Sequence, residues 1–236
     1  IPVFHDDQHG TAIVVLAGVI NSLKLVGKSF KNAKFVINGM GAAGTSIAKL
    51  LMEYGAQNML CCDKDGILND NNAVLPHHKQ LVSLTNSHNK VGTLADALVG
   101  ADVFVGVSVA GCVTQDMVKS MAKNSVLFAM ANPQPEILPQ LAKEAGAKVV
   151  GTGRSDYPNQ INNVLAFPGV FRGAFDAKAK QITQQMKLSA AQAIASLVSD
   201  DELDENYVIP SPFDKRVAQA VAQAVKNTAE QQGIVR

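Results

Sequence analysis

The sequence is poor in aromatic residues and in net charge, and both shortages exclude classes of protein. Aromatic residues make up 5% of the 236 residues and Trp is absent, whereas glycine occurs 18 times. This balance suits an α/β protein with tight turns better than a β-sandwich. Lys and Arg number 21 and Asp and Glu 20, for a net charge of +1. Bulk electrostatics therefore predicts neither nucleic acid nor an anionic membrane as a partner.

Cysteine and long apolar runs are also scarce. The three cysteines, Cys61, Cys62 and Cys112, are odd in number and irregularly spaced, which argues against a disulfide framework or a zinc site and favours a reducing compartment, the cytoplasm. The longest early apolar run, residues 13–20, is too short to span a bilayer. It follows acidic residues, which is the wrong flank for a signal peptide.

Apolar residues make up 47% of the chain, and their periodicity predicts strands that alternate with helices from residue 34 to 151. Such alternation is typical of a parallel sheet covered on both faces. We therefore predict one domain, residues 1–236, with a Rossmann-type doubly wound α/β fold and additional N- and C-terminal helices. The predicted strands are residues 34–38, 58–62, 102–107, 126–130 and 149–150. The predicted helices are residues 10–26, 42–54, 93–99, 114–121, 135–145 and 215–231.

Three stretches have a less regular pattern. Residues 2–9 read as extended and polar, and residues 64–89 as a loop with a short helix. Residues 162–197 read as mostly helical with a break near Pro168 and Gly169. No function is assigned to the pair His77 and His78, expected at the surface, or to Cys61 and Cys62, expected in the core.

A glycine-rich loop lies between a predicted strand and a predicted helix. Gly39, Gly41 and Gly44 have the G-x-G-x-x-G spacing, with Ala42 and Ala43 between them. The first glycine permits the tight turn, the second lets the backbone approach a pyrophosphate, and the third lets helix pack on strand. The free N–H groups of the helix then favour phosphate. The alternative is a tight turn without a ligand.

Asp63 ends the second predicted strand, 19 residues after Gly44. A carboxylate at this place accepts hydrogen bonds from the adenosine ribose of NAD and repels a 2′-phosphate. Lys64 could pair with that phosphate, so NADP stays possible. A solvated Asp without a ligand is the alternative.

The opening segment concentrates chemistry-bearing side chains. Asp6 and Asp7 are adjacent, and in extended chain their carboxylates would point to opposite sides. One could ligate Mg²⁺ or Mn²⁺, which prefer oxygen, while the other orients a neighbouring base. The alternative is that they cap the following helix. His5 and His9 lack a third ligand for zinc.

Later polar residues follow predicted strands. Asn132 comes at the carboxyl end of one, where open α/β sheets bind ligands, although Asn-Pro is also common turn chemistry. Arg154 could grip a carboxylate with both arms of its guanidinium. Asn162 and Asn163 could bind a ligand or cap the helix after them.

Together these segments resemble the malic enzymes, especially the compact bacterial type. The resemblance rests on residues 1–12, the glycine loop at 39–44, Asp63 with Gly66, residues 131–133 and residues 152–169, which come in the family's order. It implies an NAD-binding domain that serves the oxidative decarboxylation of (S)-malate to pyruvate and CO₂. It also implies a homodimer or larger assembly.

The resemblance implies roles at matching positions. Asp7 would ligate the catalytic Mg²⁺ or Mn²⁺, and Asp6 would hydrogen-bond the catalytic lysine. Asn132 and Asn163 would contact malate, with Asn162 beside them and Asn132 also near the cofactor. The residues that would hold NAD are Gly39, Gly41, Ala42, Ala43, Gly44 and Asp63.

The family's general-acid tyrosine, general-base lysine and Glu-Asp metal pair have no matching position here. Because the chain starts at Ile1 rather than Met, we expect a fragment whose N-terminal catalytic domain is absent, and which is inactive alone. Two alternatives stay open at this point. One is an oxaloacetate decarboxylase on the same scaffold, and the other is a non-enzymatic domain that senses NAD.

Overall fold

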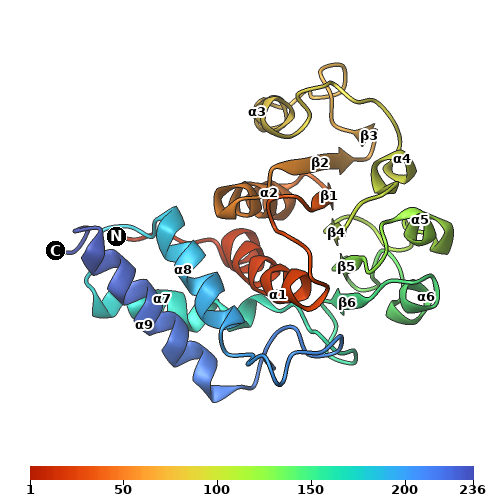
Figure 1. Cartoon of the computed structure of the whole chain (residues 1–236). Helices are drawn as coiled ribbons and strands as arrows, with labels where there is room; N and C mark the ends of the chain where they lie inside the picture. The colour runs from red at the N-terminus through yellow and green to blue at the C-terminus, as the bar shows by residue number, and fades with distance from the viewer.

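A six-stranded sheet forms the centre of the computed structural model, which describes residues 1–236 (Figure 1). The strand order is β3-β2-β1-β4-β5-β6. All neighbouring strands are parallel except β3, which runs antiparallel to β2. The strands are β1 Lys34–Asn38, β2 Asn58–Asp63, β3 Gly66–Ile67, β4 Val103–Gly106, β5 Val126–Ala129 and β6 Val149–Thr152. The predicted Rossmann-type sheet is confirmed, and only the short β3 was not predicted.

Helices cover both faces of this sheet. The α-helices are α1 Thr11–Leu25, α2 Ala42–Tyr54, α3 Pro76–Thr85, α4 Leu94–Leu98, α5 Gln115–Ser120, α6 Pro139–Glu144, α7 Phe167–Asp176, α8 Gln184–Ala195 and α9 Lys215–Gln231. Two short turns complete the list, the π-helical turn η1 Asp6–Gly10 and the 3₁₀ turn η2 Asn163–Leu165. The bounds predicted for the helices at 42–54 and 215–231 are confirmed. No helix is both long and apolar enough to cross a membrane.

The two faces of the sheet carry very different amounts of core. One face packs against α1, α2 and the α7–α9 layer in a cluster of 47 buried residues. The other packs against α4, α5 and α6 in a cluster of 17. The short strands β4 and β5 are buried along their whole length because both faces are covered. The additional helices therefore thicken only one side of the sheet, as Figure 1 shows.

The opening segment is helical at its end, and the prediction of extended chain over residues 2–9 was wrong there. The His9 N–H donates to the His5 carbonyl at 2.7 Å, and η1 continues directly into α1. Asp6 and Asp7 lie in the first turn, where negative charge is favoured by the helix dipole. In a helical turn adjacent side chains diverge by only about a quarter of a turn, so the expected opposite orientation of the two carboxylates does not hold.

The predicted break near Pro168 and Gly169 is displaced: η2 ends at Leu165, and α7 begins at Phe167 and runs through both residues. Pro168 lies in the first turn of the helix, where its missing N–H costs nothing. A Cβ at Gly169 would collide with Val221 of α9, and one at Gly173 with Val225. Gly169 and Gly173 therefore allow the close approach of two helices. A further break follows α7 at Ala177, and Thr183 caps the start of α8.

Candidate functional site

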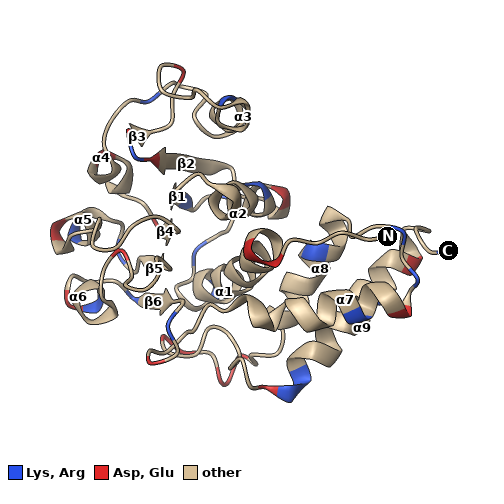
Figure 2. Ribbon diagram, turned by 180° about the vertical axis from the view of Figure 1, so that it is seen from behind, with Lys and Arg blue, Asp and Glu red and all other residues tan.

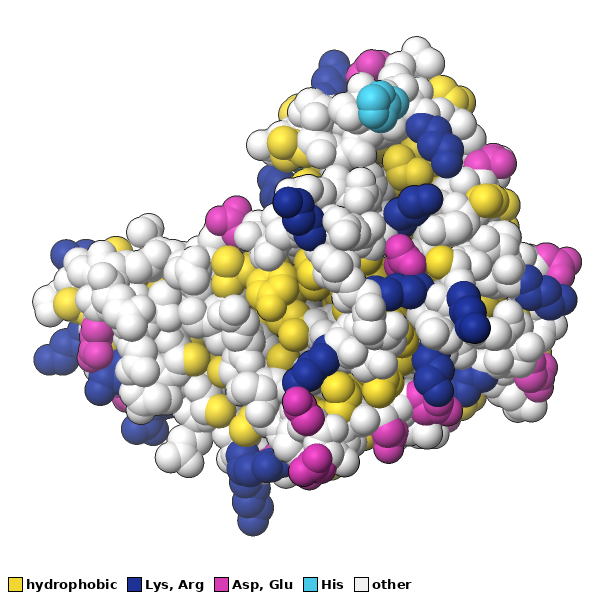
Figure 3. Space-filling model, viewed as in Figure 1, with side chains coloured by type: hydrophobic (Ala, Val, Ile, Leu, Met, Phe, Trp, Pro, Cys, Tyr) yellow, Lys and Arg dark blue, Asp and Glu magenta, His cyan; other side chains and the backbone are white.

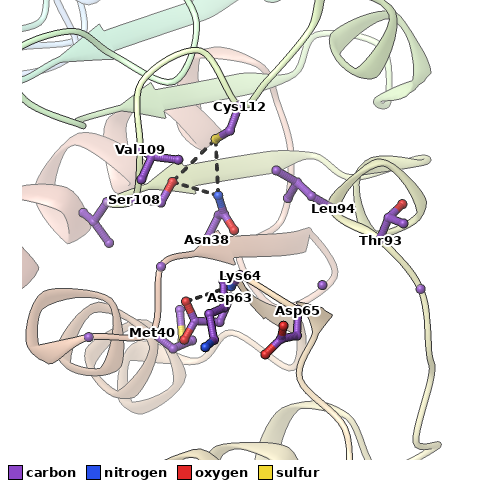
Figure 4. A pocket seen from close by; sticks show the side chains of 15 residues that line it. Asn38, Met40, Asp63, Lys64, Asp65, Thr93, Leu94, Ser108, Val109 and Cys112 are labelled. Atoms are coloured by element: carbon purple, nitrogen blue, oxygen red, sulfur yellow. Dashed lines mark hydrogen bonds between the residues drawn. The ribbon is translucent and has the colours of Figure 1, made fainter. Parts of the chain in front are cut away.

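A cavity of about 590 Å³ lies at the carboxyl ends of β1, β2 and β4 (Figure 4). Strand β1 has β2 on one side and β4 on the other, so the chain order reverses at this point. Open α/β sheets bind ligands at such a reversal. The lining residues are Asn38, Gly39, Met40, Gly41, Asp63, Lys64, Asp65, Gly66, Gly92, Thr93, Leu94, Val107, Ser108, Val109 and Cys112. The cavity therefore unites the glycine loop with Asp63, as the sequence predicts.

The glycine loop has the geometry that its spacing predicts. Gly39 has a φ of +100°, and a Cβ there would lie 2.6 Å from the Val107 carbonyl oxygen. A Cβ at Gly44 would collide with the Gly39 carbonyl oxygen, so glycine at this position lets the first turn of α2 pack closely against the loop after β1. A Cβ at Gly41 meets nothing within 4 Å, so the protein itself does not require glycine there. The open space beside Gly41 adjoins the first turn of α2, where N–H groups without helical partners favour an anion.

Asp63 closes the other side of the cavity. Its Oδ1 accepts a hydrogen bond from the Lys64 N–H at 3.0 Å, and its side chain is 35% exposed. Lys64 and Asp65 line the same wall. Two carboxylates and one ammonium group thus lie together, so this wall carries a net negative charge at neutral pH.

His78 on α3 lies behind Asp63, and the prediction that it is a surface residue was wrong. Its side chain is 8% exposed, and its Nε2 lies 3.1 Å from the Met40 carbonyl oxygen and 3.8 Å from Asp63 Oδ2. Cys61 and Cys62 are buried in β2 as expected. Burial raises the pKa of each of these thiols to about 12.

Glu136 braces the same edge of the sheet, and sequence reasoning missed it by predicting a helix from residue 135. Its carboxylate is fully buried and accepts hydrogen bonds from the N–H groups of Ser108 and Ala131, both at 2.9 Å. It therefore ties the loop after β4 to the loop after β5. Helix α6 begins only at Pro139.

A second cluster of side chains joins the segment before the first strand of the sheet to the segment after its last strand. Asn163 Nδ2 donates to Asp6 Oδ2 at 2.8 Å, although 157 residues separate them. The other oxygen, Oδ1, is buried against Gly10 and has no hydrogen-bond partner. Burial, and then the charge of Asp7, raises the pKa of Asp6, while His5 opposes the rise. A buried acceptor without a donor is costly, so Oδ1 is suited to an incoming cation or N–H group.

Asn162 and Asn163 have different contacts although they are adjacent. Asn162 Oδ1 accepts from the Val164 N–H at 3.0 Å and caps η2. This is the capping contact that the sequence left open. Asn163 turns toward Asp6 instead.

His9 and Lys187 form a basic pair beside this cluster. Lys187 Nζ lies 3.2 Å from His9 Nδ1, and the Lys187 residue is 9% exposed. Burial, then Lys187 and His5, lowers the pKa of His9 to about 4. Burial also lowers the pKa of Lys187. No local pattern indicated this pair, because His9 and Lys187 are brought together only by the packing of η1 and α8 against α1.

Asp6 and Asp7 offer oxygen atoms that suit Mg²⁺ or Mn²⁺ but do not make a complete metal site. The structure contains no group of three or more His, Cys, Asp or Glu side chains that could hold a metal ion. Asp7 is exposed, and Asp6 Oδ1 is the orphaned buried oxygen. A hard cation takes about six oxygen ligands. The residues present therefore fit part of a ligand set.

Asn132 lies in a separate cavity of about 360 Å³ at the ends of β5 and β6, with Arg154, Ser155 and Asp156. No hydrogen bond joins Asn132 to Asp6 or Asn163. The Nε and Nη2 groups of Arg154 donate to Asp156 at 2.8 and 2.7 Å, and Nη1 donates to the Pro133 carbonyl oxygen at 3.4 Å. Arg154 is therefore not free to grip a ligand carboxylate in this state.

Positively and negatively charged residues are interspersed along the chain. Lys and Arg alternate with Asp and Glu over the helices and loops (Figure 2). Hydrophobic side chains gather in the middle of one face, between the α7–α9 layer and the sheet (Figure 3). The charge distribution thus agrees with a small-molecule ligand rather than a polyanion.

The comparisons with known proteins agree on one family. The family model described as "Malic enzyme, NAD binding domain" matches residues 8–143 and 145–230. The chain is 58% identical over 238 residues to the bifunctional malic/malolactic enzyme of Bacillus subtilis, covering 100% of this chain and 58% of that protein. It is 43% identical over 253 residues to an NADP-dependent malic enzyme of Rhizobium meliloti, covering 100% of this chain and 33% of that protein.

The solved structures agree with the sequences. The NAD-dependent malic enzyme of Thermotoga maritima superposes with a TM-score of 0.91 at 47% identity, over 96% of this chain and 60% of that one. The chain thus spans between a third and 60% of the length of these relatives.

Proposed function

This chain belongs to the malic enzymes, as their NAD-binding domain, and we propose that it serves the metal-dependent oxidative decarboxylation of (S)-malate to pyruvate and CO₂. NAD, when bound, would accept the hydride from malate. The chain's own residues bind and orient the cofactor and malate. The general acid, the general base and further metal ligands would come from residues outside these 236.

The cavity of Figure 4 supports the cofactor role. In the proposal the pyrophosphate lies over Gly41 and the first turn of α2, where Ala42 and Ala43 offer their N–H groups. Asp63 accepts the ribose hydroxyls. NAD is favoured over NADP because Asp63 and Asp65 repel a 2′-phosphate more than Lys64 attracts it.

The contact between Asp6 and Asn163 is the observation that carries the malate role. It places a carboxylate from before the first strand and an amide from after the last strand side by side, with one carboxylate oxygen buried and unpaired. In the proposal Asp6 Oδ1 accepts a hydrogen bond from the catalytic lysine and so holds it near malate. In the proposal Asn163 donates to a malate oxygen, with Asn162 supporting it through its cap, and Asn132 contacts malate from the separate cavity at the ends of β5 and β6.

Asp7 is the proposed ligand of Mg²⁺ or Mn²⁺. A bound divalent cation would polarise the C2 oxygen of malate as a Lewis acid. Asp7 is exposed beside the half-buried Asp6, so its carboxylate is free to bind a cation together with ligands from outside the chain.

Two measurements test this proposal. Calorimetric titration of the chain with NAD should give binding, and Asp63→Ala should weaken it by about tenfold while the urea unfolding midpoint stays the same. The chain alone should release no pyruvate from malate with NAD and Mn²⁺. A folded sample that gives no binding heat with NAD would contradict the proposed cofactor role. Pyruvate formed by the chain alone would contradict the proposal that the general acid and general base lie outside it.

The name of the relative at 58% identity raises a second candidate, a malolactic reaction. In a preparation that also contains the proposed general acid and general base, the reaction products distinguish the candidate functions. Pyruvate with NADH indicates the malic reaction, and lactate without net NADH indicates the malolactic one. Decarboxylation of oxaloacetate without NADH formation from malate would favour the decarboxylase, and no turnover would favour an NAD sensor.

A further inference from the structure

We propose that His78 is the positioning residue that sets the preference of this domain for NAD over NADP. This inference rests on the proposed cofactor role of the cavity in Figure 4. His78 belongs to α3, in the stretch between β3 and α4 that has no regular sequence pattern. It is not one of the residues that line the cavity, so it acts through Asp63 and the glycine loop.

The first contact of His78 is with the glycine loop. Its Nε2 lies 3.1 Å from the Met40 carbonyl oxygen. A carbonyl only accepts, so Nε2 must carry the hydrogen. The same carbonyl accepts from the Thr45 hydroxyl at 3.3 Å. Two donors thus hold the Met40 carbonyl toward the protein, and the peptide that joins it to Gly41 is fixed.

The second contact is with Asp63. The Nε2–H group that donates to Met40 lies 3.8 Å from Asp63 Oδ2, while Oδ1 accepts from the Lys64 N–H. The Lys64 N–H thus holds Oδ1, and the His78 N–H lies beside Oδ2 at a distance longer than a hydrogen bond. Since His78 is 8% exposed and Asp63 is 35% exposed, water screens this contact only in part.

The two contacts affect the two dinucleotides differently. The glycine loop meets the pyrophosphate, which NAD and NADP share, so the Met40 contact affects both equally. The Asp63 carboxylate meets the ribose hydroxyls, one of which carries a phosphate in NADP. The Asp63 contact therefore favours NAD alone. His78 should change the ratio of the two dissociation constants, and a residue that merely supports the fold would not.

The chain offers matched variants. His78→Leu removes the donor and keeps an apolar side chain of similar size, whereas His78→Gln keeps an N–H donor. His77→Ala changes the neighbouring, more exposed histidine, whose ring packs edge-on against that of His78 at 4.4 Å. Asp63→Ala removes the proposed target of His78.

The test is a calorimetric titration of each variant with NAD and with NADP. His78→Leu should lower the ratio of the NADP to the NAD dissociation constant by about fivefold to tenfold. His78→Gln should restore most of the ratio, and His77→Ala should leave it unchanged. In the Asp63→Ala background, His78→Leu should not change the ratio further. An equal weakening of both dinucleotides would overturn the proposal.

Two further outcomes are distinguishable. If the wild-type chain binds neither dinucleotide, both the proposed cofactor role and this inference fail. If the chain binds NAD but His78→Leu leaves the ratio of the two dissociation constants unchanged, only this inference fails. If His78→Leu does not fold, the measurement is instead the ¹⁵N resonance of the His78 imidazole, compared between the wild type and Asp63→Ala. Nε2 should carry the hydrogen, and its resonance should move in Asp63→Ala; a resonance that does not move overturns the proposal.

Discussion

The cavity at the carboxyl ends of β1, β2 and β4 and the Asp6–Asn163 cluster differ in how the chain forms them. The cavity uses turns that directly follow β1, β2 and β4, and none of its buried polar side-chain atoms lacks a hydrogen-bond partner. The cluster joins residues 157 positions apart and keeps one buried oxygen without a donor. A site made from consecutive strand ends can be complete in one domain. A site with an orphaned carboxylate oxygen leaves an acceptor for a group from elsewhere.

The largest expected effect separates two glycines of the same loop. Gly44→Val should destabilise the fold by about 3 kcal/mol, because its Cβ collides with the Gly39 carbonyl. Gly41→Ala has open space and should change stability by less than about 1 kcal/mol. It should still weaken NAD binding by about tenfold or more, because the methyl group occupies the place of the pyrophosphate. Urea unfolding and calorimetry measure both effects. Equal losses of stability would show that Gly41 is a structural glycine.

The next effect compares the two adjacent asparagines of the cluster. Asn163→Ala leaves the Asp6 carboxylate without its hydrogen bond and should cost about 2 kcal/mol in unfolding free energy. Asn162→Ala removes only the cap on a single turn and should cost about 0.5 kcal/mol. The measurement is urea unfolding at neutral pH. If Asn162→Ala proves the more costly, the Asp6 contact does not stabilise the fold.

A smaller effect concerns the core beneath the cavity and depends on pH. Burial raises the pKa of Cys61 and Cys62 from 9.0 to about 12. The unfolded thiols ionise first, so this contribution to stability is complete below pH 9 and is lost as the pH rises toward 12. Each thiol should account for a loss of about 1 kcal/mol by about pH 9.5. Cys61→Ala should reduce the alkaline slope of the unfolding free energy, and an unchanged slope would assign it to other groups.

The smallest effect concerns the cavity beside Asn132. Asp156→Ala removes the exposed partner of Arg154 and should leave the urea midpoint unchanged, since such pairs are screened by water. The freed guanidinium should then bind a dicarboxylate such as malate more readily, measured by calorimetry at low salt. A clear drop in the midpoint would instead make the ion pair part of the scaffold.

Much of the structure around the cavity at the ends of β1, β2 and β4 was predictable from local sequence. The strand at 34–38, the helix at 42–54 and the loop between them depend on periodicity and on glycine spacing, which neighbouring residues determine. The opening segment was predicted less well. Its polar composition suggested extended chain, but packing against α2 and the favourable placement of Asp6 and Asp7 at a helix start make it helical.

Sequence alone determined the alternation of strands and helices, the glycine loop, the acidic residue after β2 and the family resemblance. Only the tertiary structure decided that Glu136 and His78 are buried braces of the cavity and that Asn163, not Asn162, meets Asp6. The reason is that periodicity reports which face of an element is apolar. The partner of a polar side chain depends on which distant element packs against it, and no local pattern carries that information.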